Sequence, residues 1–426
     1  MTSCSVAGPN PSTPEPGGET AQLRLLEGDG AAEPLRLALQ TLGWRPSTWS
    51  LVQVHHRPGA GATGIYQVDV VAGDDQVTTE FLCISTAALT APAEGTVQLT
   101  GADGLALTVW RHPHDPLLPG LAWACDAAKV GAALFEPLPD RRSAVVLPEL
   151  ATVSYRPLRR AVLTADHLGE RRYLKVLRHG QAGRLAERHR LLTSAGIPAP
   201  ELIEVPAPDV LAMHRAPGTP LAERLMRDGA RSIQPHALIN LLQNLPPESM
   251  RLPERPAWAA RVRDYAMGAA AVLPEEQARI TALTNKVHHL VSTVDAGPKV
   301  PSHGDFYEAN LLVTGESISG LLDVDALGPG HLVDDLACFI GHLAVLPSLD
   351  SRYIHVPAAL DRFLAAFDHV VDPSALRGRA AGVALTLVAG AKHRASPASP
   401  DAWHADALRR LAIAESLADA ALARRS

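Results

Sequence analysis

Hydrophobic and polar positions follow different patterns in successive parts of the chain. Residues 22–140 contain short runs in which apolar and polar side chains alternate, such as SLVQVHH and IYQVDVV, separated by turns rich in Gly and Asp. Alternation with a period of two is typical of strands with one buried face. The pattern predicts a strand-rich N-terminal unit, with one helix near residues 32–42 that ends before Gly43.

The strand pattern returns and is then replaced by helical periods. Within residues 144–218, three strand-like runs precede a helix pattern, AGRLAERHRLLTSAG, which Gly196 and Pro198 would stop. Residues 219–426 are mainly helix-compatible, except for a hairpin-like stretch at 310–325. The fold class predicted from these patterns is α+β.

Composition narrows the possible functions. The first 21 residues are rich in Pro, Gly, Ser and Thr, and we expect a flexible tail without the apolar core of a signal peptide. The net charge is −6, which gives no reason to expect nucleic acid or a lipid surface as a partner. No apolar run is long enough to suggest a membrane span, and the four cysteines are scattered. A cytoplasmic location is the expectation, and the oligomeric state is unknown.

A weak internal repeat links the first two parts of the chain. Residues 54–62 (VHHRPGAGA) align with 153–161 (VSYRPLRRA), and residues 80–85 (EFLCIS) resemble 172–177 (RYLKVL). The N-terminal unit is therefore either a degenerate structural relative of the unit that follows, or similar to it by chance.

The main chemical signal lies in SHGDFYEANLLV and the following SGLLDVDALGPGHLVDDLACF. Phosphoryl transfer needs a carboxylate that orients the attacking hydroxyl, together with oxygen ligands for Mg²⁺ on the phosphates. Asp305 fits the first role, and Asn310 and Asp323 supply hard oxygen atoms for the second. Each residue alone has an ordinary alternative, in a turn or at the end of a strand. The order and spacing of all three favour phosphoryl transfer, with Asp325 as a second, less favoured ligand.

These segments resemble the aminoglycoside phosphotransferase/choline kinase superfamily, whose members have a protein-kinase-like bilobal fold. The resemblance follows the family pattern HGDxxxxN and IDWxxAxxGxxxxDLA. The matching residues here are His303, Gly304, Asp305, Asn310, Asp323, Gly328 and Asp335. By resemblance, Asp305 is the base, Asn310 and Asp323 hold Mg²⁺, and His303 and Asp335 brace the loop. The donor implied is ATP or GTP.

The resemblance also places a nucleotide lobe in residues 144–218 and a catalytic, acceptor-binding lobe in 219–426. Lys175 stands in an apolar strand, where a lysine needs a partner for its ammonium group. In this fold the partners are nucleotide phosphates and a helix glutamate, here Glu187. Further nucleotide-binding candidates are Arg159 and Arg160 in the turn YRPLRRAV, and Met213 in the hinge.

A more conspicuous glycine pattern is assigned to a turn. Residues 59–64 spell GxGxxG, but the strand-like IYQVDVVAG follows instead of a dinucleotide-binding helix. In the repeat alignment, Cys83 stands where the second unit has Lys175. The paired histidines at 55–56, 112–114 and 288–289 lack the second half of a zinc site.

The sequence therefore predicts an enzyme that moves the γ-phosphoryl of ATP or GTP to a small-molecule hydroxyl. The acceptor is an aminoglycoside, or alternatively a sugar, an amino sugar or an amino alcohol. A regulatory pseudokinase is the alternative from a different class, and a protein kinase is disfavoured because no activation segment follows LDVD. The extra N-terminal unit is similar in layout to the cap regions of bacterial maltokinases and glucosamine kinases.

Overall fold

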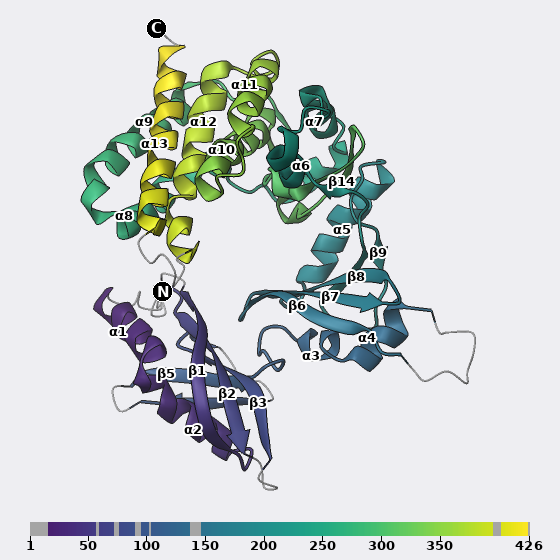
Figure 1. Cartoon of the computed structure of the whole chain (residues 1–426), viewed down its shortest axis with the longest axis vertical. Coiled ribbons are helices and arrows are strands. Elements are labelled where there is room, and N and C mark those ends of the chain that lie inside the picture. The colour runs from purple at the N-terminus through teal and green to yellow at the C-terminus, as the bar shows by residue number, and fades with distance from the viewer. Residues whose placement is uncertain are drawn as a thin grey trace, which may run out of the picture. The chain divides into compact units, whose positions relative to one another are not determined.

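The computed structural model describes residues 16–56, 59–71, 76–89, 95–101, 104–136, 146–394 and 402–424 (Figure 1). The chain divides into two compact units. Unit 1 comprises Met1–Gly183 and Ile203–His214, and unit 2 comprises Arg184–Leu202 and Arg215–Ser426. Two five-stranded sheets in unit 1 and a mainly helical unit 2 confirm the predicted α+β class.

The first sheet of unit 1 has the strand order β1-β2-β3-β5-β4. Its strands are β1 (Arg45–His56), β2 (Ala62–Val71), β3 (Val77–Ser85), β4 (Thr96–Thr100) and β5 (Ala106–Arg111). All neighbouring pairs are antiparallel. Helices α1 (Pro16–Glu27) and α2 (Ala32–Gln40) precede the sheet and bury Leu26, Leu35 and Leu39 in one core with it.

Helix α1 corrects the tail expected over residues 1–21. Residues 1–15 lie outside the described residues, whereas α1 begins at Pro16. Proline is well tolerated in the first turn of a helix because its missing N–H would have no partner there. Leu26 is fully buried and its carbonyl accepts a hydrogen bond of 2.6 Å from the Tyr66 hydroxyl. This tertiary packing outweighs the low helix propensity of the glycines in the first turn.

The second sheet has the strand order β6-β7-β8-β10-β9. Its strands are β6 (Glu149–Arg156), β7 (Arg160–His167), β8 (Glu170–Leu177), β9 (Leu202–Ile203) and β10 (Val210–His214). Helices α3 (Leu121–Ala124) and α4 (Ala127–Leu134) share a core with this sheet. Residues 121–134, expected in the N-terminal unit, therefore pack with the second sheet. Helix α5 (Gln181–Ser194) follows β8.

Unit 2 contains two small sheets and the remaining helices. The sheets have the orders β11-β13-β14 and β12-β15. Their strands are β11 (Thr219–Pro220), β12 (Lys299–Ser302), β13 (Leu311–Thr314), β14 (Ser317–Leu321) and β15 (Gly328–His331). The helices are α6 (Leu221–Asp228), α7 (Pro235–Gln243), α8 (Val262–Val272), α9 (Gln277–Thr293), α10 (Leu332–Leu349), α11 (Val356–Phe367), α12 (Pro373–Thr386) and α13 (Ala402–Ala423).

Helix α10 forms the centre of the unit 2 core. Its length and apolar composition are sufficient for a membrane span, which the sequence had not suggested, yet 67% of the helix is buried inside the protein. Phe339 on α10 contacts the rings of Phe363 and Phe367 on α11 at centroid distances of 4.9 and 6.1 Å. Such burial is typical of the central helix of a packed domain. The first turn of α10 carries Asp335, which faces the candidate site.

Candidate active site

The candidate site is organised around the loop that joins β12 to β13. The backbone N–H groups of His303 and Gly304 each donate a hydrogen bond of 2.8 Å to one carboxylate oxygen of Asp335. Asp335 is almost fully buried. Burial raises its pKa to about 7, while the donors from Gly304, His303 and Ser302 act in the opposite direction. One side chain on α10 thus fixes the start of the loop.

The imidazole of His303 connects this loop to the end of the β13–β14 hairpin. His303 is fully buried, and its Nε2 lies 3.0 Å from the carbonyl oxygen of Leu322. Its Nδ1 accepts the N–H of Asp305 at 3.3 Å. Because Nδ1 accepts, the hydrogen-bond network assigns the proton to Nε2. Burial lowers the pKa of His303, which agrees with a neutral ring.

Gly304 allows the loop to approach the turn that carries the expected metal ligand. Its φ is +78°, a left-handed conformation that favours glycine. A Cβ atom at this position would lie 2.9 Å from the Cβ of Ala326 and 3.0 Å from its carbonyl oxygen. Any larger residue would therefore push the loop away from the short helix η6 (Val324–Ala326).

Asn310 and Asp323 stand at the two ends of the hairpin beyond Asp305. The side-chain amide of Asn310 donates to the carbonyl oxygen of Asp305 at 2.9 Å, so its amide oxygen points elsewhere. The backbone carbonyl of Asn310 accepts the N–H of Leu322 at 2.8 Å. Asp323 follows at once in a left-handed conformation, φ +51° and ψ +54°. Non-glycine residues rarely adopt this region, and such strain is frequent at functional sites.

Several carboxylates of this loop and its surroundings lie close enough to Tyr307 to affect its pKa. Burial raises its pKa well above the ordinary value, and the nearby carboxylates of Asp305, Glu308 and Asp323 raise it further. Its ring stacks on His342 of α10 with centroids 4.1 Å apart. Burial lowers the pKa of His342 to about 4, so that ring is neutral at physiological pH.

The expected nucleotide-binding residues fall in both units. Lys175 in unit 1 is buried in β8, where it pairs with Val162 on β7 and Leu211 on β10. Glu187 lies on the exposed side of α5 and belongs to unit 2. Lys175 is therefore a buried strand residue, as the sequence predicts.

The other nucleotide-binding candidates lie in unit 1. Arg159 is exposed in the turn between β6 and β7, and the half-buried Arg160 begins β7. Met213 on β10 is half-buried and pairs with Tyr173. Their roles toward a nucleotide stay predictions.

Sequence reasoning missed Arg188, which lies next to Glu187 on α5. Its Nε donates to the carbonyl oxygen of Leu327 at 3.2 Å, directly after η6. Burial and the nearby Arg255 lower its pKa, while Asp325 acts in the opposite direction. Arg188 thus joins α5 to the segment that carries Asp323 and Asp325. The sequence signal was weak, because a charged residue on a polar helix is ordinary.

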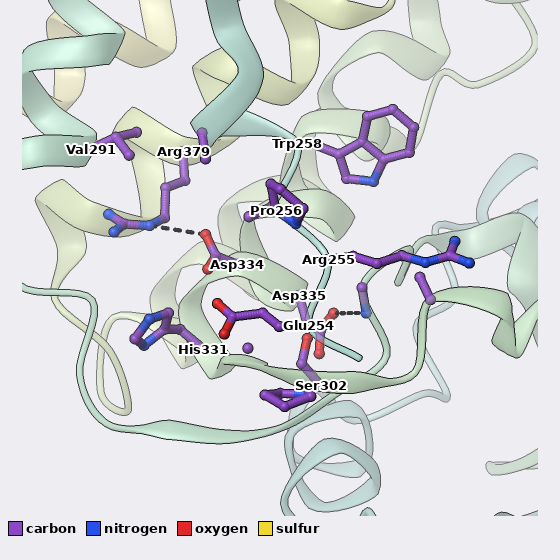
Figure 2. A pocket seen from close by; sticks show the side chains of 16 residues that line it. Glu254, Arg255, Pro256, Trp258, Val291, Ser302, His331, Asp334, Asp335 and Arg379 are labelled. Carbon is purple, nitrogen blue, oxygen red and sulfur yellow. Dashed lines mark hydrogen bonds and ion pairs between the residues drawn. The ribbon is translucent and has the colours of Figure 1, made fainter. Parts of the chain in front are cut away.

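A pocket of about 510 Å³ borders the loop. Ser302, Gly304 and Ala326 form part of its wall, and the segment 254–260 covers another part. Figure 2 shows the guanidinium of Arg379 reaching Asp334, with the Nε–Oδ1 distance at 3.0 Å. Trp258 and Val291 complete the apolar part of the lining.

Aromatic and basic side chains meet beside this pocket. Trp258 and Tyr265 lie 5.5 Å apart between centroids, and the guanidinium of Arg261 sits 5.2 and 5.1 Å from their centroids. The charge of Asp305 acts on Tyr265 by raising its pKa, although burial is the larger cause. Sequence reasoning missed this cluster because its members carry no motif.

Among the described residues, no group of three or more His, Cys, Asp or Glu side chains forms a metal-binding cluster. The histidine pairs singled out in the sequence therefore form no such cluster there. The donor set of amide and carboxylate oxygens at Asn310 and Asp323 matches the ligand preference of Mg²⁺.

A family model described as "Phosphotransferase enzyme family" matches residues 158–379. A search of curated protein sequences finds no match. Among solved structures, aminoglycoside phosphotransferase APH(4)-Ia in a thermostable apo form is 13% identical, with a TM-score of 0.47, over 64% of this chain and 94% of that chain. APH(4)-Ia has also been solved in a ternary complex with ADP and hygromycin B.

Two further solved structures are similar in the same range. The choline/ethanolamine kinase family protein from Mesorhizobium loti is 18% identical, with a TM-score of 0.43, over 69% of this chain and 94% of that chain. APH(3'')-Id from Streptomyces rimosus is 20% identical, with a TM-score of 0.38, over 56% and 92%.

Proposed function

The chain belongs to the phosphotransferase enzyme family, and from this premise we propose that it transfers the γ-phosphoryl group of ATP or GTP to a small-molecule hydroxyl. The observation that carries the proposal is the braced loop at 303–310. Asp335 holds its two first N–H groups and His303 links it to Leu322. Family membership agrees with the superfamily that the motifs resemble.

In this proposal, Asp305 orients the acceptor hydroxyl and accepts its proton. Transfer of a phosphoryl group depends mainly on positioning and on stabilising charge, rather than on covalent chemistry by the protein. The loop geometry serves this need, because the backbone of Asp305 is fixed on both sides. Its N–H donates to His303 and its carbonyl accepts from Asn310.

Asn310 and Asp323 would hold Mg²⁺ through their side-chain oxygens. The hydrogen bond from the Asn310 amide nitrogen to Asp305 orients the amide oxygen toward another partner, which fits a metal ligand. When bound, Mg²⁺ neutralises the charge that develops on the transferred phosphate. Lys175 would position the nucleotide phosphates, supported by Glu187, and Arg159 and Arg160 would contact the phosphates from the turn before β7.

The pocket beside Gly304 is the proposed acceptor site, and its charges favour some acceptors over others. Its three carboxylates are already engaged: Glu254 with Lys299, Asp334 with Arg379, and Asp335 with the loop N–H groups. Arg255 makes no hydrogen bond or ion pair within the described residues. A polycation would therefore meet Arg255 in a lining whose own carboxylates are already engaged.

A neutral or acidic hydroxyl compound, such as a sugar, suits this lining better than an aminoglycoside. An amino alcohol with a quaternary ammonium group is also disfavoured. Aromatic rings bind such cations through their faces, and Arg261 already lies over the faces of Trp258 and Tyr265.

The test is an acceptor panel scored by ADP or GDP release. Glucose, glucosamine, glucuronate, maltose, choline and one aminoglycoside differ in charge while each carries a hydroxyl. We expect turnover with a neutral or acidic member, and a loss of at least about 10³-fold in kcat for Asp305→Ala. Asp361→Ala, on the exposed side of α11, is the matched control.

Retained turnover in Asp305→Ala would exclude this residue as the base. A wild-type protein that binds nucleotide yet phosphorylates no member of the panel would favour the alternative of a regulatory pseudokinase.

A further inference from the structure

The turn between β6 and β7 is held in an unusual way at Leu158. In the proposed function, this turn covers the nucleotide phosphates and contacts them through Arg159 and Arg160. Leu158 has a φ of +62°, although a left-handed conformation is unfavourable for a leucine. Its N–H donates to Oδ2 of Asp115 at 2.8 Å, and its carbonyl accepts from Nε of Arg178 at 2.5 Å. Both peptide groups of the tip are therefore fixed.

Asp115 lies in the segment that follows the first sheet, outside the second sheet altogether. It is 5% exposed, and its Oδ1 accepts the N–H of Leu117 at 2.9 Å. Its Oδ2 also accepts the hydroxyl of Tyr155, on β6, at 2.8 Å. The same hydroxyl accepts the indole N–H of Trp110, on β5, at 3.2 Å. A chain of hydrogen bonds thus runs from the first sheet to the tip of the turn.

The side chain of Leu158 is also anchored in the first sheet. It is 6% exposed and shares a small core with Ile65 on β2, Cys83 on β3 and Trp110 on β5. The three positions lie side by side, since Cys83 pairs with Ile65 on one side and with Trp110 on the other. Their side chains form an apolar socket for Leu158.

A leucine keeps a left-handed backbone only where its surroundings dictate it. At Leu158 the surroundings are one buried carboxylate, one guanidinium and an apolar socket. Burial raises the pKa of Asp115, whereas the N–H donors of Leu158 and Leu117, Tyr155 and the charge of Arg178 act in the opposite direction. The left-handed backbone of Leu158 and the buried carboxyl of Asp115 both cost free energy. That the fold keeps them indicates that the turn must be held in this position.

We propose that the N-terminal sheet is a positioning element for nucleotide binding, in which Asp115 and the socket for Leu158 hold the β6–β7 turn in its phosphate-covering conformation. This inference rests on the proposed function and assigns a role to the N-terminal sheet. Asp115 and Leu158 are positioning residues, because they act through the turn and not on the reacting atoms. Loss of their contacts should weaken nucleotide binding while the chemistry at Asp305 continues.

The experiment compares Asp115→Asn with wild type in the full chain. An asparagine amide cannot accept hydrogen bonds on both of its terminal atoms, so part of the network around Leu158 is lost. We expect the KM for MgATP to rise about tenfold, with kcat changed less than about twofold. The Kd of MgATP from calorimetry should rise in parallel, and the Leu158 amide should exchange its hydrogen faster.

A second variant keeps the test decisive if Asp115→Asn folds poorly. Leu158→Gly removes the anchored side chain and relieves the left-handed strain, which offsets part of the packing that is lost. It should raise the Kd of MgATP in the same direction when binding is measured well below the Tm of the variant. Asp126→Asn is the matched control in unit 1, since Asp126 accepts the N–H groups of Ala128 and Lys129 at the exposed start of α4.

The outcomes separate this inference from the proposed function. If wild type binds MgATP and both variants bind it equally well, the positioning role is wrong while the proposed function stands. If kcat falls and KM does not, the contacts serve only stability or chemistry, and the inference is again overturned. If wild type binds neither MgATP nor MgGTP, the proposed function and the inference fall together.

Discussion

The two sheets of unit 1 share a strand order but differ at the positions that matter for a nucleotide. In each, the third strand lies between the second and the fifth, which agrees with the weak sequence repeat. The third strand of the second sheet carries Lys175, whereas the first sheet has Cys83 at the aligned position. Burial raises the pKa of the Cys83 thiol and keeps it neutral. The same strand order thus places Lys175 in the second sheet at the position where the first sheet has the small, neutral side chain of Cys83.

The connections differ as well. After β8 the chain enters α5, which carries Glu187 and Arg188. The residues described between β3 and β4 form no helix. The glycine-rich turn follows β1 in the first sheet, and Leu158 occupies the tip of the turn in the second. The glycine pattern thus lies in a turn, while the prediction of a nucleotide lobe rests on the lysine and the helix that follows it.

The largest expected effect is at the two aligned third-strand positions. Lys175→Met should lower kcat/KM for nucleotide by about 10²–10³-fold, because in the proposed function the phosphates lose the cation that positions them. Cys83→Ala should leave kcat near wild type and reduce the free energy of unfolding by about 1 kcal/mol, through lost packing. Steady-state kinetics and urea titration measure the two effects. Equal losses of kcat/KM in both variants would show that the two sheets do not differ in their role toward the nucleotide.

An intermediate effect, on stability, is expected at Gly61. It should distinguish the turn after β1 from the β6–β7 turn. Gly61 has a φ of +86°, and a Cβ there would lie 2.8 Å from backbone atoms of Ala87. Gly61→Ala should therefore cost about 2 kcal/mol of stability, yet leave the Kd of MgATP unchanged. Thermal unfolding and calorimetry check both statements. A weaker Kd for this variant, at unchanged temperature, would show that the first turn also serves the nucleotide.

The smallest effect is the pH dependence at the junction of the two sheets. Burial raises the pKa of Asp115 above its ordinary value of 3.8. A carboxyl that binds its proton more tightly in the folded state stabilises the fold at low pH and loses that contribution as pH rises through its folded-state pKa. The free energy of unfolding of wild type minus that of Asp115→Asn should therefore fall as pH rises from below 3.8. If this difference in the free energy of unfolding did not change with pH across the acid range, the raised pKa of Asp115 would be contradicted.

Local spacing explains what could be predicted from the sequence. Asp305, Asn310 and Asp323 lie within one loop and one hairpin, so their order alone indicated the loop that the structure describes. The buried strand position of Lys175 was predictable because a lysine within an apolar run is conspicuous in the sequence. Helix α1 was missed because its first turn is rich in glycine and only tertiary contacts favour it.

Long-range partners explain what could not be predicted. Asp115 lies 43 positions from Leu158, and Asp334 lies 45 positions from Arg379. Neither pair has a motif, and a buried aspartate in a Pro-rich stretch looks like a turn residue in the sequence. Arg188 was hidden for the same reason, since its acceptor at Leu327 is 139 positions away. Each of these contacts exists only once the chain has folded.

The fixed tip at Leu158 has a thermodynamic consequence. A mobile phosphate-covering turn loses conformational entropy when a nucleotide arrives, and that loss weakens binding. Here the contacts of Leu158 with Asp115 and with the apolar socket order the turn through the chain itself. Nucleotide binding should consequently show a smaller unfavourable entropy than in Leu158→Gly, where the ligand itself must order the turn. The N-terminal sheet would then supply part of the ordering of the turn that a bound nucleotide would otherwise have to supply.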